Sequence, residues 1–368
     1  MKRNRNPKQI QLLEKNIQRT RDIIQATPRD IPIDPEQKDT EISLFAYNAN
    51  NCLVQSLLPI SEVSPQFFKQ TETQTWLNFD VLNRTQIETI GKQLNLHFLI
   101  VDDILSVHQR PKMDEIDGHL TCVMQMMYYN ETNESVINEQ VSFVLGKNYL
   151  LTFQDEARRD LFNPLRDKLK TTGTKVRQQA VDYLLYSLID SIVDHYFNVL
   201  EKLGDKIERI EEELTKQEED DQAMMSRINR LRKELIFFKR NTAPVREMIN
   251  AIVRSDNAYI DSNTTKYFKD IYDQMLQVND LSENYRDLLV NIRDLYLSRM
   301  NMKLNEVMKF LAIVTTLLAP ATVIGGIFGM NFDRIPYLHH QDGFWIATLL
   351  MMAIPILMLA YFRRRNWF

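Results

Sequence analysis

One helical register in the last third of the chain carries side-chain oxygen atoms and then changes to small and hydroxyl-bearing residues. Alternating steps of three and four place side chains on one helix face. The first part of this register runs through Asp270, Asp273, Gln277, Asp280, Asn284, Asp287, Asn291, Asp294, Ser298, Asn301 and Asn305. It continues through Met308, Ala312, Thr315, Ala319, Thr322, Gly326 and Gly329. Hard divalent cations bind oxygen ligands, so this 270–329 register could line a path for a hydrated cation.

The same register has a second explanation that periodicity alone does not exclude. Its first part could be a solvated helix face, and its second part a small-residue packing seam that includes the spacing Gly325 to Gly329. A period of 3.5 residues sustained over this length predicts a left-handed helical bundle. Because one or two such helices enclose nothing, the path explanation requires a homo-oligomer.

Two uncharged runs near the C-terminal end predict transmembrane helices. Residues 310–328 and 344–362 carry no charge, and each run rises roughly 28 Å as a helix, which matches the hydrocarbon thickness of a bilayer. Two such runs so close together are rarely a buried core pair. Arg363, Arg364 and Arg365 follow the second run, so the positive-inside rule predicts that both termini are cytoplasmic.

Composition excludes several other classes of protein. A net charge of -4 gives no support for nucleic-acid binding, which needs a concentrated basic patch. Cys52 and Cys122 have no partners at zinc-site spacing and form no disulfide framework. No apolar run follows the basic N-terminus, so a cleaved export signal is not expected. Gly-rich phosphate loops, His-Glu-x-x-His patterns and nucleophile elbows are missing, so an enzyme is not expected.

The chain predicts an α+β fold, in which a cytosolic α/β domain with a mainly antiparallel sheet precedes long helices. Strand-type runs at 143–145 and 149–153 flank Gly146-Lys147-Asn148, which has the length of a hairpin turn. The expected parts are a polar arm (1–37), the α/β domain (38–172), a helical hairpin (173–255), a stalk (256–309), the first span (310–328), an external loop (329–343), the second span (344–362) and a basic tail (363–368).

Gly329-Met330-Asn331, directly after the first span, resembles the signature of the CorA family of Mg²⁺ channels. The resemblance extends to Asn305-Glu306-Val307-Met308-Lys309 and to Pro320 within the span. Further similar segments lie at 103–112, 183–190 and 267–273. It therefore covers the chain from about residue 40 to its end.

The resemblance implies a funnel-shaped homopentamer in the cell inner membrane whose first spans line the pore. Asn331 would form a ring at the external mouth, with Gly329 and Met330 completing the selectivity filter. A ring of carboxamides suits Mg²⁺, because this ion releases its hydration water reluctantly. Met308 and Leu311 would form a hydrophobic constriction, and Asn305 a polar ring below it. The transported ion would be Mg²⁺, with Co²⁺ and Ni²⁺ as further candidates.

The resemblance also implies a sensor for cytosolic Mg²⁺ between subunits. Asp103 of one subunit would face Asp270 of its neighbour, and Asp102 and Asp190 are lesser candidates. Carboxylates that face each other repel when no ion is bound, and a divalent cation between them stabilises the closed state. The alternative for each aspartate is an ordinary solvated surface position.

Three departures from the family pattern leave the transported ion open. Pro336 is followed by Tyr337 where the family has Glu, and Arg334 adds a positive charge near the mouth. Ala319 stands where a bulky pore residue is expected. His339 and His340 could bind Zn²⁺, Co²⁺ or Ni²⁺. The competing functions are a Zn²⁺, Co²⁺ or Ni²⁺ transporter of the same architecture and a membrane-anchored metal-sensing scaffold that conducts no ion.

Overall fold

The computed structural model describes residues 41–68, 70, 72–107, 109–155, 161–216, 221–330, 336 and 341–365. The chain divides into two compact units, Met1–Val290 and Asn291–Phe368. The predicted polar arm 1–37 lies outside the described residues. So do four residues named above, Arg334, Tyr337, His339 and His340, and the last residue of the signature, Asn331.

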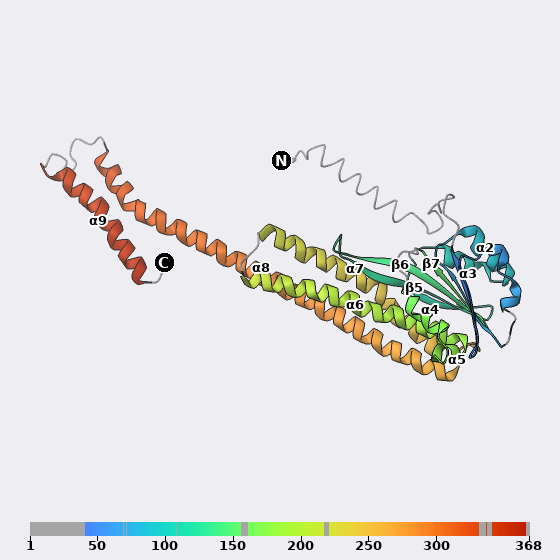
Figure 1. Ribbon diagram of the computed structural model, residues 1–368. Coiled ribbons are helices and arrows are strands. Elements are labelled where there is room, and N and C mark those ends of the chain that lie inside the picture. Colours follow the sequence, from blue (N-terminus) through green and yellow to red (C-terminus); the bar gives the residue numbers. More distant parts are fainter. Residues whose placement is uncertain are drawn as a thin grey trace. The chain divides into compact units, whose positions relative to one another are not determined.

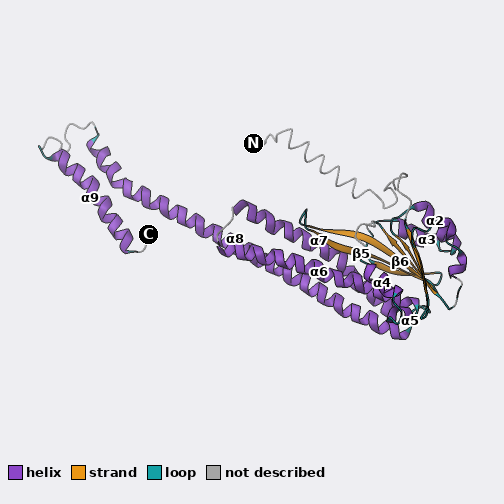
Figure 2. Ribbon diagram, viewed as in Figure 1, coloured by secondary structure: helices purple, strands orange, loops and turns teal. Residues whose placement is uncertain are grey.

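The described part of the first unit contains one seven-stranded sheet (Figure 2). Its strands are β1 (Ile42–Tyr47), β2 (Cys52–Gln55), β3 (Gln74–Phe79), β4 (Lys112–Ile116), β5 (His119–Asn130), β6 (Ser135–Leu145) and β7 (Tyr149–Gln154). They lie in the order β2-β1-β3-β7-β6-β5-β4. The β3–β7 pair is parallel, and the other neighbours are antiparallel. The prediction of a mainly antiparallel sheet is confirmed, as is the hairpin that joins β6 to β7.

Helices cover both faces of this sheet (Figure 1). An apolar cluster joins one face to α2 (Arg84–Gln93) and α3 (Phe98–Leu105), and includes Ile87 and Ile104. On the other face, Tyr196 of α6 (Val181–Lys216) donates a hydrogen bond of 2.5 Å to the backbone oxygen of Gln125 in β5. Because β5 is covered on both sides, it is buried almost continuously and lacks the alternation of a half-exposed strand.

Long helices complete the first unit. After α4 (Asn163–Lys170) and the short α5 (Lys175–Gln178), α6 (Val181–Lys216) and α7 (Asp221–Arg254) form the predicted helical hairpin. The buried Asp182 accepts hydrogen bonds from the backbone N–H groups of Tyr183 (2.8 Å) and Asp261 (2.9 Å). This carboxylate therefore ties the start of α6 to the turn that precedes α8.

Helix α8 runs from Ser262 to Phe328 without interruption, and so joins the predicted stalk to the first apolar run. Pro320 lies inside it and lacks a backbone N–H, yet the helix continues beyond this residue.

In the second unit, the end of α8 and α9 (Gly343–Arg364) are long and apolar enough to cross a membrane. Within their most apolar windows only 6% of α8 and 11% of α9 is buried. Leu311 and Leu349, for example, are 61% and 67% exposed. A soluble core helix would be covered, so the exposure of these helices favours a membrane environment.

Candidate functional site

The two faces of α8 differ sharply within the single chain. Every position of the 270–329 register is exposed. The opposite register is offset by two residues, or about 200° around a helix. Up to Tyr296 it is buried at Phe268, Ile271, Met275, Val278, Ser282, Leu289, Ile292 and Tyr296. Beyond Tyr296 it is mostly uncovered, since Ile313 is buried but Phe310 is 67% exposed. Within one chain, the first part of α8 therefore has a covered apolar face and an exposed oxygen-bearing face, whereas the membrane-length part is exposed on most sides.

Two arginines approach the oxygen-bearing face from the side. The guanidinium of Arg286 lies 3.0 Å from the carboxylate of Asp287, and that of Arg293 lies 3.0 Å from Asp294. These side chains are largely exposed, so each pair contributes little to stability.

Three other carboxylates of the register, those of Asp270, Asp273 and Asp280, have no ion-pair partner among the described residues. This part of the face therefore keeps uncompensated negative charge.

Hydroxyl groups on the membrane-length part of α8 present acceptor lone pairs. Thr315 donates its hydroxyl hydrogen to the backbone oxygens of Leu311 and Ala312, both at 3.0 Å. Thr322 donates in the same way to Leu318, also at 3.0 Å. Since the hydrogen is used internally, the exposed oxygen of each threonine faces outward as an acceptor. Such an oxygen can accept hydrogen bonds from the water molecules of a hydrated cation.

The glycines of α8 show where α9 packs. A Cβ added at Gly325 would lie 3.6 Å from the Met351 side chain of α9, whereas one added at Gly326 would meet open space. The packing seam within one chain therefore includes Gly325 and leaves the 270–329 register uncovered. Neighbouring copies could still pack on that register.

The described part of the predicted selectivity filter is the end of α8. The backbone N–H of Gly329 donates to Gly325 at 3.0 Å, and that of Met330 donates to Ile327 at 3.3 Å. A Cβ at Gly329 would approach the Gly325 carbonyl oxygen to 3.0 Å, which is tighter than most real contacts. Met330 is 51% exposed. Met308 and Leu311, the predicted constriction, are 52% and 61% exposed.

Asp103 lies near the end of α3 and is engaged by a lysine that sequence reasoning did not single out. The ammonium of Lys112 is 2.7 Å from Asp103 Oδ2 and 3.0 Å from Asp114 Oδ2. Burial lowers the pKa of Lys112, but hydrogen bonds to the two carboxylates outweigh it, so the pKa is raised overall and the ammonium stays charged. No local sequence pattern signals this pair, because it depends on how α3 packs beside β4, which begins at Lys112.

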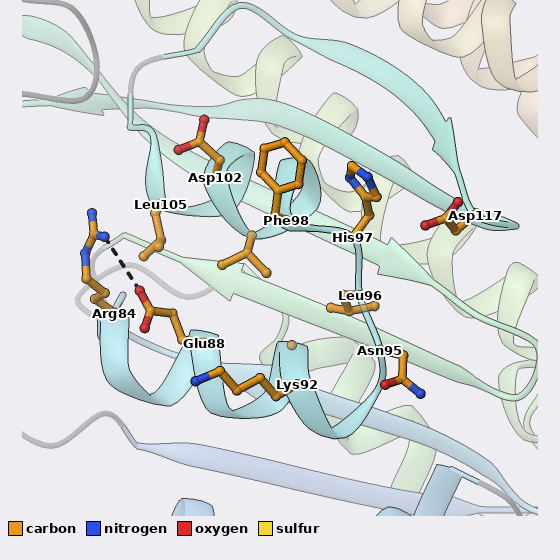
Figure 3. Close-up of a pocket in the computed structure, with 12 residues that line it drawn as sticks. Arg84, Glu88, Lys92, Asn95, Leu96, His97, Phe98, Asp102, Leu105 and Asp117 are labelled. Carbon is orange, nitrogen blue, oxygen red and sulfur yellow. Dashed lines mark ion pairs between the residues drawn. The ribbon is translucent and has the colours of Figure 1, made fainter.

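Asp102 occupies a different environment from its neighbour. It is exposed and lines a pocket of about 720 Å³ between α2 and α3 (Figure 3). The ion pair of Arg84 and Glu88, 3.6 Å apart, lies at the rim of this pocket. Phe98, which is 69% exposed, projects from the same helix as Asp102. The structure therefore separates the surroundings of Asp102 from the Lys112 contact of Asp103.

Asp270 is positioned at the start of α8 by aromatic packing. Tyr267 packs against Tyr183 and Tyr186 of α6, with ring centroids 5.3 and 5.1 Å apart. The buried Phe268 lies edge-on to Tyr186 at 6.0 Å. These contacts fix the rotation of the helix, which leaves Asp270 exposed.

Among the predicted sensor residues that the structure describes, Asp190 lies close enough to Asp270 for their charges to interact within one chain. Burial raises the pKa of Asp190, as do the nearby charges of Asp194 and Asp270, while hydrogen bonds from Gln274 and Tyr186 oppose the rise. The buried Oδ1 of Asp190 and Oε1 of Gln274 have no donor among the described residues. Each of these acceptors is thus suited to bind a proton or a cation.

A complete metal site is not formed by one chain in the part that the structure describes. These residues contain no group of three or more histidine, cysteine or acidic side chains that could hold a metal ion. Asp103 and Asp270, the two main sensor candidates, are not joined by a hydrogen bond or ion pair in this part of the chain either.

The fold and the exposed helix face define the class of the protein. A folded α/β unit followed by two uncovered apolar helices is the organisation of a membrane protein with a large domain outside the bilayer. Comparison with known proteins then identifies the family. Residues 71–364 match the family described as CorA-like Mg²⁺ transporter protein, and the chain belongs to this family.

Individual relatives agree with this assignment. The chain is 35% identical to the cobalt/magnesium transport protein CorA of Thermotoga maritima over 90% of this chain and 93% of that protein. It is 29% identical to the putative metal ion transporter YfjQ of Bacillus subtilis, over 80% and 89% of the two chains. The complete structure of the CorA magnesium transporter from Methanocaldococcus jannaschii superposes with a TM-score of 0.73 at 24% identity, over 88% of this chain and 98% of that one. The last comparison shows that the fold is shared.

Proposed function

We propose that the chain is one subunit of a homopentameric channel that conducts Mg²⁺ into the cell. The observation that carries this proposal is the exposed 270–329 register of α8, which up to Tyr296 lies opposite a buried apolar register and which continues into the membrane-length part of the same helix. Copies arranged around an axis would bring the exposed registers together. Oxygen atoms and small side chains would then surround a space wide enough for a cation that keeps its water.

The proposed conduction path follows the 270–329 register from outside to inside. Asn331 forms the external ring, and the acceptor oxygens of Thr322 and Thr315 lie along the path below it. Met308 and Leu311 form a constriction that blocks ions by excluding water when the channel is closed. Asn305 forms a polar ring on the cytosolic side. With both termini cytoplasmic, Arg363 to Arg365 lie at the inner membrane surface.

Gating in this proposal depends on Mg²⁺ bound between subunits. Asp103 of one subunit and Asp270 of the next hold the ion, with Asp102 and Asp190 as additional ligands. Support comes from the exposure of Asp270, which lacks an ion-pair partner in the described region, and from single-chain ligand sets that are incomplete. Loss of the ion at low internal Mg²⁺ leaves the carboxylates repelling each other, which favours opening.

Ion flux in liposomes tests the proposal. The purified protein should admit Mg²⁺ to vesicles that contain a Mg²⁺ indicator, and Co²⁺ should compete. Asn331→Ala should abolish this flux, while the matched control Asn198→Ala, at an exposed asparagine of α6 outside the register, should retain it. Uptake of Zn²⁺ without any response to Mg²⁺ would instead favour the zinc transporter. A protein that binds Mg²⁺ but passes no ion would favour the scaffold.

A further inference from the structure

Lys112 bridges two carboxylates at the predicted sensor. Its Nζ lies 2.7 Å from Asp103 Oδ2 and 3.0 Å from Asp114 Oδ2. The side chains of Lys112, Asp103 and Asp114 are 38%, 22% and 41% exposed, so the pair with Asp103 is more enclosed than an ordinary surface ion pair. A cation that belongs to the chain therefore already occupies the carboxylate that the sensor needs.

Polar contacts around the α3–β4 connection hold this arrangement in place. Gln109 donates through Nε2 to the backbone oxygen of Asp103 at 3.0 Å, and its backbone N–H donates to Gln140 Oε1 at 2.8 Å. Gln140 donates in turn to the backbone oxygen of Ser106 at 2.9 Å. Lys112 itself is the first residue of β4 and is paired with Val123 in β5. The backbones that carry the carboxylate and the ammonium are thus both tied to the same sheet, while the two side chains keep their own rotational freedom.

The position of Lys112 has an electrostatic consequence for any divalent ion at Asp103. The Lys112 ammonium repels a divalent cation bound within a few ångströms of it. The two cations also compete for Oδ2 of Asp103. Asp114 offers the ammonium a second partner, so Lys112 can leave Asp103 without losing all its compensation. The contact can therefore be exchanged, rather than being permanent.

We propose that Lys112 is a built-in competitor for the Asp103 carboxylate and sets the Mg²⁺ concentration at which the sensor fills. This inference rests on the proposed function, since it assumes that Asp103 is a sensor ligand. Removal of the ammonium should increase the affinity for Mg²⁺. Removal of Asp114 should decrease it, because Lys112 then has Asp103 as its remaining carboxylate partner.

Mg²⁺-dependent thermal stabilisation of the full-length protein in detergent tests this inference without measuring transport. Lys112→Met should lower the Mg²⁺ concentration for half-maximal stabilisation by about tenfold. Lys112→Arg keeps the charge and should leave this midpoint concentration within about threefold of the parent value. Asp114→Asn should raise the midpoint concentration. Lys202→Met, which removes a lysine paired with Glu131 in the same unit, is the matched control and should leave it unchanged.

The outcomes separate the inference from the function on which it rests. If Asp103→Ala removes the Mg²⁺ response but Lys112→Met leaves the midpoint unchanged, the role of Lys112 is wrong and the sensor stands. If both Asp103→Ala and Asp270→Ala keep the parent response, the sensor itself is wrong. Should Lys112→Met fail to fold, Asp114→Asn decides, because an unchanged or lowered midpoint in that variant contradicts the competition.

Discussion

At the residue scale, burial changes the chemistry of Asp190 on α6. Its pKa lies above the ordinary value, because burial and the charge of Asp194 outweigh the hydrogen bonds from Gln274 and Tyr186. The folded state therefore holds the proton more tightly than the unfolded chain. The stabilising contribution of this group is complete below the unfolded-state pKa and is lost as the pH rises through the higher folded-state pKa.

We expect Asp190→Asn to stabilise the protein at neutral pH when Mg²⁺ is removed by a chelator. The amide carries no charge, and it can donate a hydrogen bond to Gln274 Oε1, which has no donor in the described region. The melting temperature should rise by about 2 °C at pH 7.5, and the gain should shrink toward pH 5. The control Asp205→Asn, at an exposed position of the same helix, should change the melting temperature little. A lower melting temperature for Asp190→Asn at both pH values would contradict the stated protonation.

At the element scale, periodicity predicted where the long helices lie in the sequence. It could not predict which other segments their side chains would contact. The 270–329 register and the uncharged run 310–328 indicated the long helix that the structure has as α8. Periodicity did not predict that Asp103 and Asp270 would act together; that prediction came from the family resemblance alone. Contacts between distant segments, such as that of Lys112 with Asp103, depend on how α3 and β4 pack. No local period encodes such a contact, and for this reason the ion pair was missed.

The packing of α6 on α8 gives the prediction at this scale. Gly204 lies against Tyr285, and a Cβ at Gly204 would clash with the tyrosine ring. Gly204→Val should destabilise the first unit by about 1–3 kcal/mol, since the two helices cannot close to their native distance. Chemical unfolding of the full-length protein measures this loss, with the exposed Glu201→Val as the control. Adding Tyr285→Ala should recover part of it, and strict additivity of the two changes would argue against the contact.

At the scale of the whole molecule, the chain leaves two kinds of surface uncovered. The first is the apolar surface of the two spanning helices, which lipid can cover. The second is the 270–329 register of α8, whose polar part from Asp270 to Asn305 requires water and whose membrane-length part adds the hydroxyl oxygens of Thr315 and Thr322. In the proposed channel, association of several copies would place this register against water in the centre of the assembly.

Cysteine accessibility distinguishes these two surfaces in the assembled protein. With Cys52 and Cys122 replaced, Thr315→Cys and Thr322→Cys should react with a membrane-impermeant charged thiol reagent, and the reaction should reduce Mg²⁺ flux. Ile327→Cys is the control, since Ile327 is 50% exposed on the same helix but lies about 100° around it from Gly326 and about 200° from Gly329, the nearest register positions. It should stay unreactive, because a thiol that faces lipid cannot ionise readily. Equal protection of all three positions would mean that the register faces lipid or a dry seam, and the channel would have no path through α8.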